Sequence, residues 1–166
     1  MLSAESATGK YPREAVETMD RIIKSTERHK MYRSMIEATQ PNEDQTPPHA
    51  VATAAADLAT VIPATAIVAY TSSGTTAARI ARKRPALPIL AVTPNRATLR
   101  RLCLLWGAHG VLSEDVHSYE QMVDHASELA VSEEFAQPGD LVVIVAGIPF
   151  AQAGTTNNLR VAAIPR

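Results

Sequence analysis

Residues 64–85 read ATAIVAYTSSGTTAARIARKRP, an apolar β-type run that passes through a loop of hydroxyl residues into a helical segment. The β-type run ends at Tyr70, and the one glycine of the loop is Gly74. A junction of this kind points unpaired backbone N–H groups and the positive end of a helix dipole at one place. The hydroxyl side chains around that place belong to Thr71, Ser72, Ser73, Thr75 and Thr76. The stretch therefore predicts a strand, a loop suited to a phosphate and a helix, in that order.

Strand-type and helix-type segments alternate on both sides of this junction. The expected strands are 65–70, 89–92, 110–112, 141–146 and 159–164, and the expected helices are 49–61, 74–83, 94–106 and 118–135. Such alternation predicts βαβ units and a parallel sheet, but the last strand follows a loop without a helix and should run antiparallel at an edge. The predicted fold class is α/β, a three-layer sandwich with a five-stranded, mostly parallel sheet.

Single residues set the helix boundaries inside this pattern. Thr93 followed by Pro94 predicts the start of one helix, because threonine caps helices and proline suits the first helical position. Ser118 with Gln121 has the spacing of a capping box at the start of the next helix. The earlier of the two helices should turn its apolar side chains inward, namely Leu99, Leu102, Cys103 and Trp106.

The first 48 residues differ in character from the rest. Apolar positions at helical spacing predict a helix from Pro12 to Ile36. Residues 37–48, EATQPNEDQTPP, have the composition of a linker, and their prolines prevent a helix from continuing. We therefore expect three parts: a helical segment over 1–36, a linker over 37–48 and an α/β domain over 49–166.

Composition excludes several classes of protein. The net charge of −1 argues against a nucleic-acid binder, which would be clearly basic. No apolar run approaches the length of a membrane span, and the first residues lack the pattern of a signal peptide. One cysteine allows no internal disulfide, which suits a reducing, cytoplasmic setting.

A second loop adds to the phosphate prediction. Residues 147–158, GIPFAQAGTTNN, leave the end of a parallel strand, so they should lie on the same side of the sheet as 71–76. The residues expected to close over a bound anion are Gly154, Thr155, Thr156 and Asn157. For both loops a structural alternative stays open: the first is a hydroxyl-rich helix cap, and the second only shapes a turn.

Catalytic and cofactor signatures are missing from the sequence. Neither a dinucleotide-binding G-x-G-x-x-G after a strand nor a P-loop occurs, and no general base stands beside a nucleophile. The five histidines lack the spacing of metal ligands, and Cys103 is expected to be a small core residue. Arg79 is near enough to the hydroxyl loop to assist an anion, whereas Arg96, Arg100 and Arg101 have the pattern of a solvated helix face.

The order of motifs along the chain resembles the pyruvate kinase family. The opening MLSAESATGKYPREAV is similar to that family's MLSGETAxGxYPxEAV, which ends its catalytic barrel and leads into the C-terminal domain. The rest of the chain resembles that domain through the motifs IVAYTSSGTTA, PILAVTPN, WGAHGV, GDLVVIVAGIP and GTTNNLRV. The resemblance covers nearly the whole chain and implies a five-stranded sheet with an antiparallel last strand.

The resemblance implies that residues 71–76 form the phosphate pocket for an allosteric sugar phosphate or nucleotide, with the loop at 153–157 folding over it. Family members activated by fructose 1,6-bisphosphate often carry a lysine where this chain has Ser72. The arginine that contacts their second phosphate has no clear counterpart here. A monophosphate such as AMP, ribose 5-phosphate or glucose 6-phosphate is thus as well suited.

Catalysis in the family belongs to a part of the chain that these motifs do not match. The resemblance implies that the catalytic lysine, the Mg²⁺ ligands and the K⁺ site lie in the barrel, and only Ser3 and Glu5 match residues bordering that site. We therefore expect no catalytic residue, metal or cofactor in these 166 residues, and no activity of the chain alone. The expected partners are the effector, the catalytic barrel and a second copy of the chain, met across a two-fold axis near 159–164.

Three functions are consistent with the sequence. The first is the regulatory and oligomerisation domain of a cytoplasmic, glycolytic pyruvate kinase. The second is a freestanding module that binds phosphorylated metabolites. The third is a purely structural domain that serves subunit contacts, in which the hydroxyl loop binds nothing.

Overall fold

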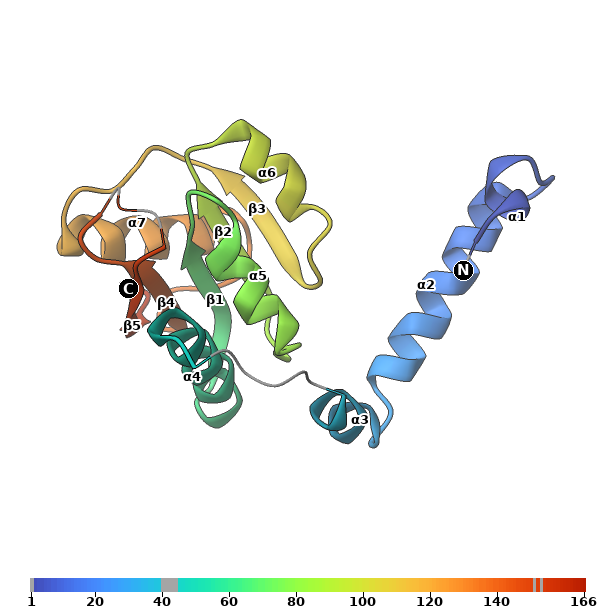
Figure 1. Ribbon diagram of the computed structural model, residues 1–166, viewed down its shortest axis with the longest axis horizontal. Coiled ribbons are helices and arrows are strands. Elements are labelled where there is room, and N and C mark those ends of the chain that lie inside the picture. The colour runs from blue at the N-terminus through green and yellow to red at the C-terminus, as the bar shows by residue number, and fades with distance from the viewer. Residues whose placement is uncertain (1, 40–44, 151, 153) are drawn as a thin grey trace. The chain divides into compact units, whose positions relative to one another are not determined.

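The computed structural model describes residues 2–39, 45–150, 152 and 154–166, and the chain divides into two compact units (Figure 1). The N-terminal unit is Met1–Gln40, and the α/β unit is Pro41–Arg166. The expected linker at 37–48 lies around this boundary, and its residues 40–44 fall outside the described part of the chain. Each unit is described by itself.

A five-stranded sheet forms the centre of the α/β unit. Its strands are β1 (Ala64–Tyr70), β2 (Ile89–Thr93), β3 (Ala108–Leu112), β4 (Leu141–Gly147) and β5 (Thr156–Ala163). They lie in the order β3-β2-β1-β4-β5, with the first four parallel and β5 antiparallel to β4. The predicted fold class is confirmed, including the antiparallel strand at the edge.

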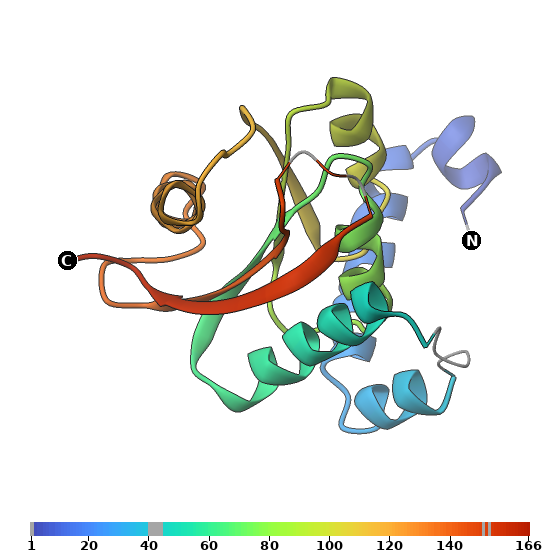
Figure 2. The same ribbon diagram turned by 60° about the vertical axis from the view of Figure 1, so that its left-hand side comes forward.

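Helices cover both faces of the sheet (Figure 2). They are α4 (Pro47–Val61), α5 (Thr75–Arg82), α6 (Arg96–Leu102) and α7 (Tyr119–Ser132). One core cluster joins Ala55 of α4, Ile80 of α5 and Leu102 of α6 to side chains of β1, β2 and β4. The other joins Met122 and Ala126 of α7 to the opposite side chains of the same strands. Because both faces of the central strands are covered, their sequences are continuously apolar rather than alternating.

Alanines allow α4 to approach the sheet closely. The residues that it buries are His49, Ala52, Ala55, Ala56 and Ala59. Val51, Leu58 and Ile62 are only half-buried, at the margin of the contact. The small side chains lie at the centre because a densely packed helix-to-sheet contact leaves no room there for larger ones.

The start of α6 differs from the prediction. Thr93 is the last residue of β2 and is fully buried, so it extends the strand instead of capping a helix at Pro94. Asn95 is the cap, and its Oδ1 accepts hydrogen bonds from the N–H groups of Ala97 and Thr98 at 2.8 and 3.4 Å. Asparagine is among the strongest capping residues, which explains why the helix begins two residues later.

The prediction of inward apolar residues after Leu102 is wrong for Cys103. The helix ends at Leu102, which is buried, and Cys103 is exposed as its C-cap. Trp106 is half-buried, and the Arg84 guanidinium lies 4.9 Å from the centre of its ring. Helical spacing stops being a guide to burial as soon as the helix ends.

The capping box at the start of α7 is confirmed in its first half. Ser118 Oγ accepts a hydrogen bond from the Gln121 N–H at 3.1 Å. The Gln121 side chain reaches back to the N–H of His117, at 2.8 Å, instead of that of Ser118.

The N-terminal unit consists of α1 (Ala4–Ala7), α2 (Pro12–Glu27) and α3 (Tyr32–Ala38). The single helix predicted from Pro12 to Ile36 is therefore two helices, broken by a tight turn in which the His29 N–H bonds to Thr26 O. None of the described residues in these helices is buried, and Val16, Ile22 and Ile23 are exposed apolar positions of α2.

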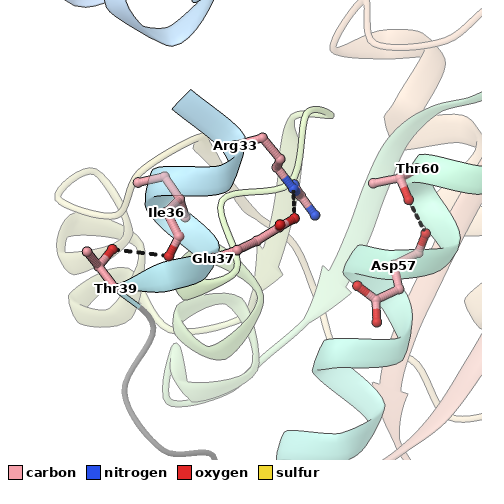
Figure 3. A network of polar contacts seen from close by, with 6 residues as sticks. All are labelled: Arg33, Ile36, Glu37, Thr39, Asp57 and Thr60. Carbon is pink, nitrogen blue, oxygen red and sulfur yellow. Dashed lines mark hydrogen bonds and ion pairs between the residues drawn. The ribbon is translucent and has the colours of Figure 1, made fainter. Parts of the chain in front are cut away.

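Local polar contacts mark the ends of the helices (Figure 3). On α3, Arg33 Nε lies 2.8 Å from Glu37 Oε1, one turn further on. On α4, the Thr60 hydroxyl donates to the backbone oxygen of Asp57 at 2.7 Å. An exposed ion pair one turn apart on a helix contributes on the order of 0.3–0.5 kcal/mol, so the Arg33–Glu37 contact does not determine the fold.

None of the helices in the described part of the chain combines the length and the apolar character that crossing a membrane requires.

Candidate functional site

The hydroxyl loop, residues 71–76, follows the carboxyl end of the central strand β1. The chain moves from β1 to β2 on one side, and β4 lies on the other side of β1. The carboxyl ends of β1 and β4 therefore border a topological switch point, the place where open α/β sheets bind ligands. The second predicted loop leaves β4 at the same edge, as the sequence indicates.

The helix α5 begins without a side-chain cap. Its N-cap is Gly74, at a φ of +89°, and no side chain in the described part of the chain accepts a hydrogen bond from its first amides. Thr71 Oγ1 instead accepts from the Gly74 N–H at 2.9 Å, which closes the loop one residue earlier. By contrast, α6 and α7 are capped by Asn95 and Ser118. The N–H groups at the start of α5 thus remain available to an anion.

Two threonines bring the predicted loops together. Thr76 Oγ1 and Thr156 Oγ1 lie 2.7 Å apart, and both residues are buried. The contact joins the first turn of α5 to the first residue of β5, 80 positions further along the chain. Ser73 Oγ and Thr75 Oγ1, which are exposed, form a second hydroxyl pair at 2.7 Å.

Two residues of α6 donate hydrogen bonds to backbone carbonyls of the hydroxyl loop. The Thr98 hydroxyl donates to Ser72 O at 2.9 Å, and the Arg101 guanidinium donates to Ser73 O at 3.3 Å and to Thr98 Oγ1 at 3.1 Å. Both loop carbonyls are therefore directed toward α6. The sequence does not single out Thr98, and it predicts a solvated helix face for Arg101, because the roles of both residues follow from the neighbouring position of β2 in the sheet.

A cavity of about 60 Å³ opens beside the loop. Five of the predicted residues line it, namely Thr71, Ser72, Ser73, Thr76 and Thr156. Gly74 and Thr75 belong to the same loop but are not part of the lining, and Arg79, the predicted helper for an anion, does not line the cavity either.

The remaining predicted residues shape the second loop. Asn157 accepts from the Ile148 N–H with its Oδ1 at 2.8 Å and donates from Nδ2 to Ile148 O. The Thr155 hydroxyl donates to Gln152 O at 2.7 Å, and Gly154 has a φ of +85°. Because β5 begins at Thr156 and not at 159, Thr156 and Asn157 lie in the strand.

A hydrogen-bonded chain lies on the α7 side of the cavity. The Tyr70 hydroxyl donates to Met122 O at 3.0 Å and lies 3.2 Å from His125 Nδ1, and His125 Nε2 lies 2.8 Å from Ser113 Oγ. Because the Tyr70 hydroxyl gives its proton to Met122 O, its oxygen accepts from His125 Nδ1–H. Burial, with a smaller contribution from the Glu128 carboxylate, raises the pKa of the Tyr70 hydroxyl above its ordinary value.

The raised pKa of Tyr70 predicts a loss of stability in alkaline solution. The folded state favours the neutral hydroxyl, so its contribution is complete below the unfolded pKa of about 10 and is lost as the pH rises past it. Tyr70→Phe should cost about 1 kcal/mol at neutral pH through its lost hydrogen bonds. Above pH 10, that difference should shrink by up to about 1.4 kcal/mol per pH unit. Urea unfolding of both proteins between pH 7 and 11 checks this, and a constant difference would contradict it.

Among the described residues, no three His, Cys, Asp or Glu side chains gather closely enough to hold a metal ion.

In sequence, this chain is similar to pyruvate kinases. Residues 49–162 match the family model described as pyruvate kinase, alpha/beta domain. A pyruvate kinase of Agrobacterium vitis is 60% identical over 164 residues, which are 99% of this chain and 34% of that protein. Pyruvate kinases of Methylorubrum extorquens and Geobacillus stearothermophilus are 42% and 39% identical, over 100% and 97% of this chain and 35% and 27% of those proteins. The chain thus spans about a third of the length of the curated relatives it matches.

Proposed function

This chain belongs to the pyruvate kinase family, and on that premise we propose that it forms the regulatory and oligomerisation domain of a pyruvate kinase and binds a phosphorylated effector. The parent enzyme transfers a phosphoryl group from phosphoenolpyruvate to ADP and yields pyruvate and ATP in glycolysis. The cytoplasm is the proposed compartment.

The uncapped start of α5 is the observation that carries the effector proposal. The first turn of this eight-residue helix has no side-chain cap, and its Thr76 lines the cavity together with other hydroxyl residues. A phosphate ester satisfies both features at once, since it accepts several hydrogen bonds and carries negative charge. The cavity also lies at the switch point of the sheet, where ligand sites of such folds occur.

In this proposal, some residues of the chain bind the phosphate and others stabilise the loops around it. Ser72 and Ser73, which line the cavity, donate hydrogen bonds to the phosphate, together with free N–H groups in the first turn of α5. Thr71 and Thr76 already form hydrogen bonds within the protein, so they stabilise the conformation of the loop. Their hydroxyl groups have room for a further hydrogen bond to the ligand. The loop that contains Gly154, Thr155, Thr156 and Asn157 closes the side of the site next to β4.

The proposed partners of this domain are the rest of a pyruvate kinase and a second copy of the chain. The resemblance assigns Mg²⁺ and K⁺ to the catalytic barrel, where Ser3 and Glu5 would border the active site. Within the described part of the chain, the edge strand β5 pairs only with β4. This free edge supports the proposal of a contact between copies there.

We expect the 166-residue chain to show no turnover by itself. The family resemblance assigns the catalytic lysine and the metal ligands to a segment that these residues do not match. A coupled assay with phosphoenolpyruvate, ADP, Mg²⁺ and K⁺ measures this directly, and pyruvate formation above the protein-free blank would contradict the proposal.

Binding is tested separately by titration calorimetry with inorganic phosphate, ribose 5-phosphate, glucose 6-phosphate and AMP. The proposal predicts saturable binding of at least one phosphate monoester at one site per chain. Absence of binding by all four would favour a purely structural domain instead.

A further inference from the structure

Three polar side chains of α4 and α5 have buried atoms without a hydrogen-bond partner. His49 is 7% exposed, and both of its ring nitrogens lack a partner within the described part of the chain. The same holds for Thr53 Oγ1, one turn further along α4, and for Arg79 Nη1 on α5. Because buried polar groups without hydrogen bonds are costly and rare, these atoms indicate a bound partner that is not part of the chain.

The topology of the fold brings the three side chains together. The helices α4 and α5 lie side by side on one face of the sheet, where α4 also contacts β5 (Figures 1 and 2). On α5, Thr76 directs its hydroxyl to Thr156 of β5, and Arg79, three residues later, lies on the same side of the helix. Both helices run antiparallel to β1, so the sense of the helical turn puts His49 and Thr53 on the side of α4 toward α5. All three side chains therefore face the contact between the two helices.

The chemistry of these side chains favours an anion. A neutral imidazole and a threonine hydroxyl can each donate one hydrogen bond, and a guanidinium group only donates. Arg79 forms no ion pair with any described residue. The helix α5 contains no acidic residue, and Asp57, the one acidic residue of α4, is exposed.

The local electrostatics point the same way. His49 lies in the first turn of α4, so the positive end of the helix dipole adds to the charge of the Arg79 guanidinium. A water molecule would satisfy hydrogen bonds but leave this positive charge without a counterion. A small anion accepts from all three donors and compensates the charge at the same time.

We propose that His49, Thr53 and Arg79 bind one small monovalent anion, such as chloride, between α4 and α5. The site is separate from the proposed function, because none of these residues lines the cavity beside the hydroxyl loop. The anion binds only when the two helices are packed together, so it stabilises the folded state by mass action.

A crystal of the full chain grown with sodium bromide in place of chloride tests the site directly, because bromide scatters X-rays anomalously. We expect an anomalous peak between α4 and α5, within hydrogen-bond distance of Arg79 and of His49 or Thr53. A water molecule without anomalous signal at this position would overturn the inference.

Urea unfolding tests the same site in solution. Chloride is varied from about 5 to about 150 mM at constant ionic strength, with gluconate, a much larger anion, as the replacement. The folding equilibrium constant of the full chain should rise by at least about threefold over this range, which corresponds to a Kd of about 50 mM or below. Arg79→Met should remove this dependence on chloride, and Thr53→Val, which replaces the hydroxyl with a methyl group, should weaken it.

The control is Arg82→Met, which removes the same charge from an exposed position of the same helix and should keep the full dependence on chloride. Equal dependence in Arg79→Met and Arg82→Met would contradict the anion site, as would a folding equilibrium of the unmodified chain that does not respond to chloride. Either outcome leaves the proposed function intact, because phosphate binding at the hydroxyl loop is measured separately.

Discussion

Leu90→Ala should lower the free energy of unfolding of the α/β unit by about 3 kcal/mol. Leu90 has no exposed surface and lies in β2, between β1 and β3. Its side chain belongs to the core cluster under α7, with Val68 and Met122. Removing three carbons there loses their transfer free energy and leaves a cavity that paired strands on both sides cannot close.

Leu104→Ala is the matched control, because it makes the same chemical change at a side chain that is 88% exposed. Its effect should stay within about 0.5 kcal/mol. Urea unfolding followed by circular dichroism measures both variants, with the slope on denaturant concentration unchanged. Equal effects at the two positions would contradict the assignment of Leu90 to the core.

Ser72→Asp should weaken the binding of any phosphate monoester by at least about thirtyfold. Ser72 is exposed, lines the phosphate cavity and has its carbonyl held by Thr98. A carboxylate at this position stands next to the phosphate, and two like charges about 4 Å apart repel by several kcal/mol where water is partly excluded. Titration calorimetry with the tightest monophosphate found for the unmodified chain gives the ratio of Kd values.

The control for this variant is Ser72→Asn, which has the shape of the aspartate without its charge. It should weaken binding by less than about fivefold. The aspartate should not reduce stability, since a negative charge near the start of α5 interacts favourably with the helix dipole. If the asparagine and aspartate variants lost affinity equally, charge at Ser72 would not be the cause, and the loop would have to bind the phosphate elsewhere.

Sequence alone predicted the sheet because its strands are unambiguous. The segments that became β1, β2 and β4 are short apolar runs bounded by turn or helix signals, and each proved to be buried. The absence of a helix between β4 and β5 was sufficient to predict the antiparallel edge. Boundaries were less predictable where two local signals compete, as at Thr93, where pairing of the strand prevailed over capping by threonine.

The candidate site could be predicted only for residues that are adjacent in sequence. Hydroxyl groups around Gly74 follow one another, so their gathering at one helix end needs no tertiary information. The hydrogen bonds from Thr98 and Arg101 depend on β2 lying beside β1, and the presence of Glu114 and Asp115 in the cavity lining depends on where the segment after β3 passes. No local pattern encodes either neighbourhood.

The most direct test of phosphate binding at the hydroxyl loop is a nuclear magnetic resonance titration of the ¹⁵N-labelled chain with fructose 6-phosphate. We expect the amide signals of residues 72–77 to shift most and to saturate together, with smaller shifts near Thr156. In Ser72→Asp the same shifts should require at least about thirtyfold more ligand. Shifts that concentrate in another part of the chain, or no shifts at millimolar ligand, would contradict phosphate binding at the hydroxyl loop.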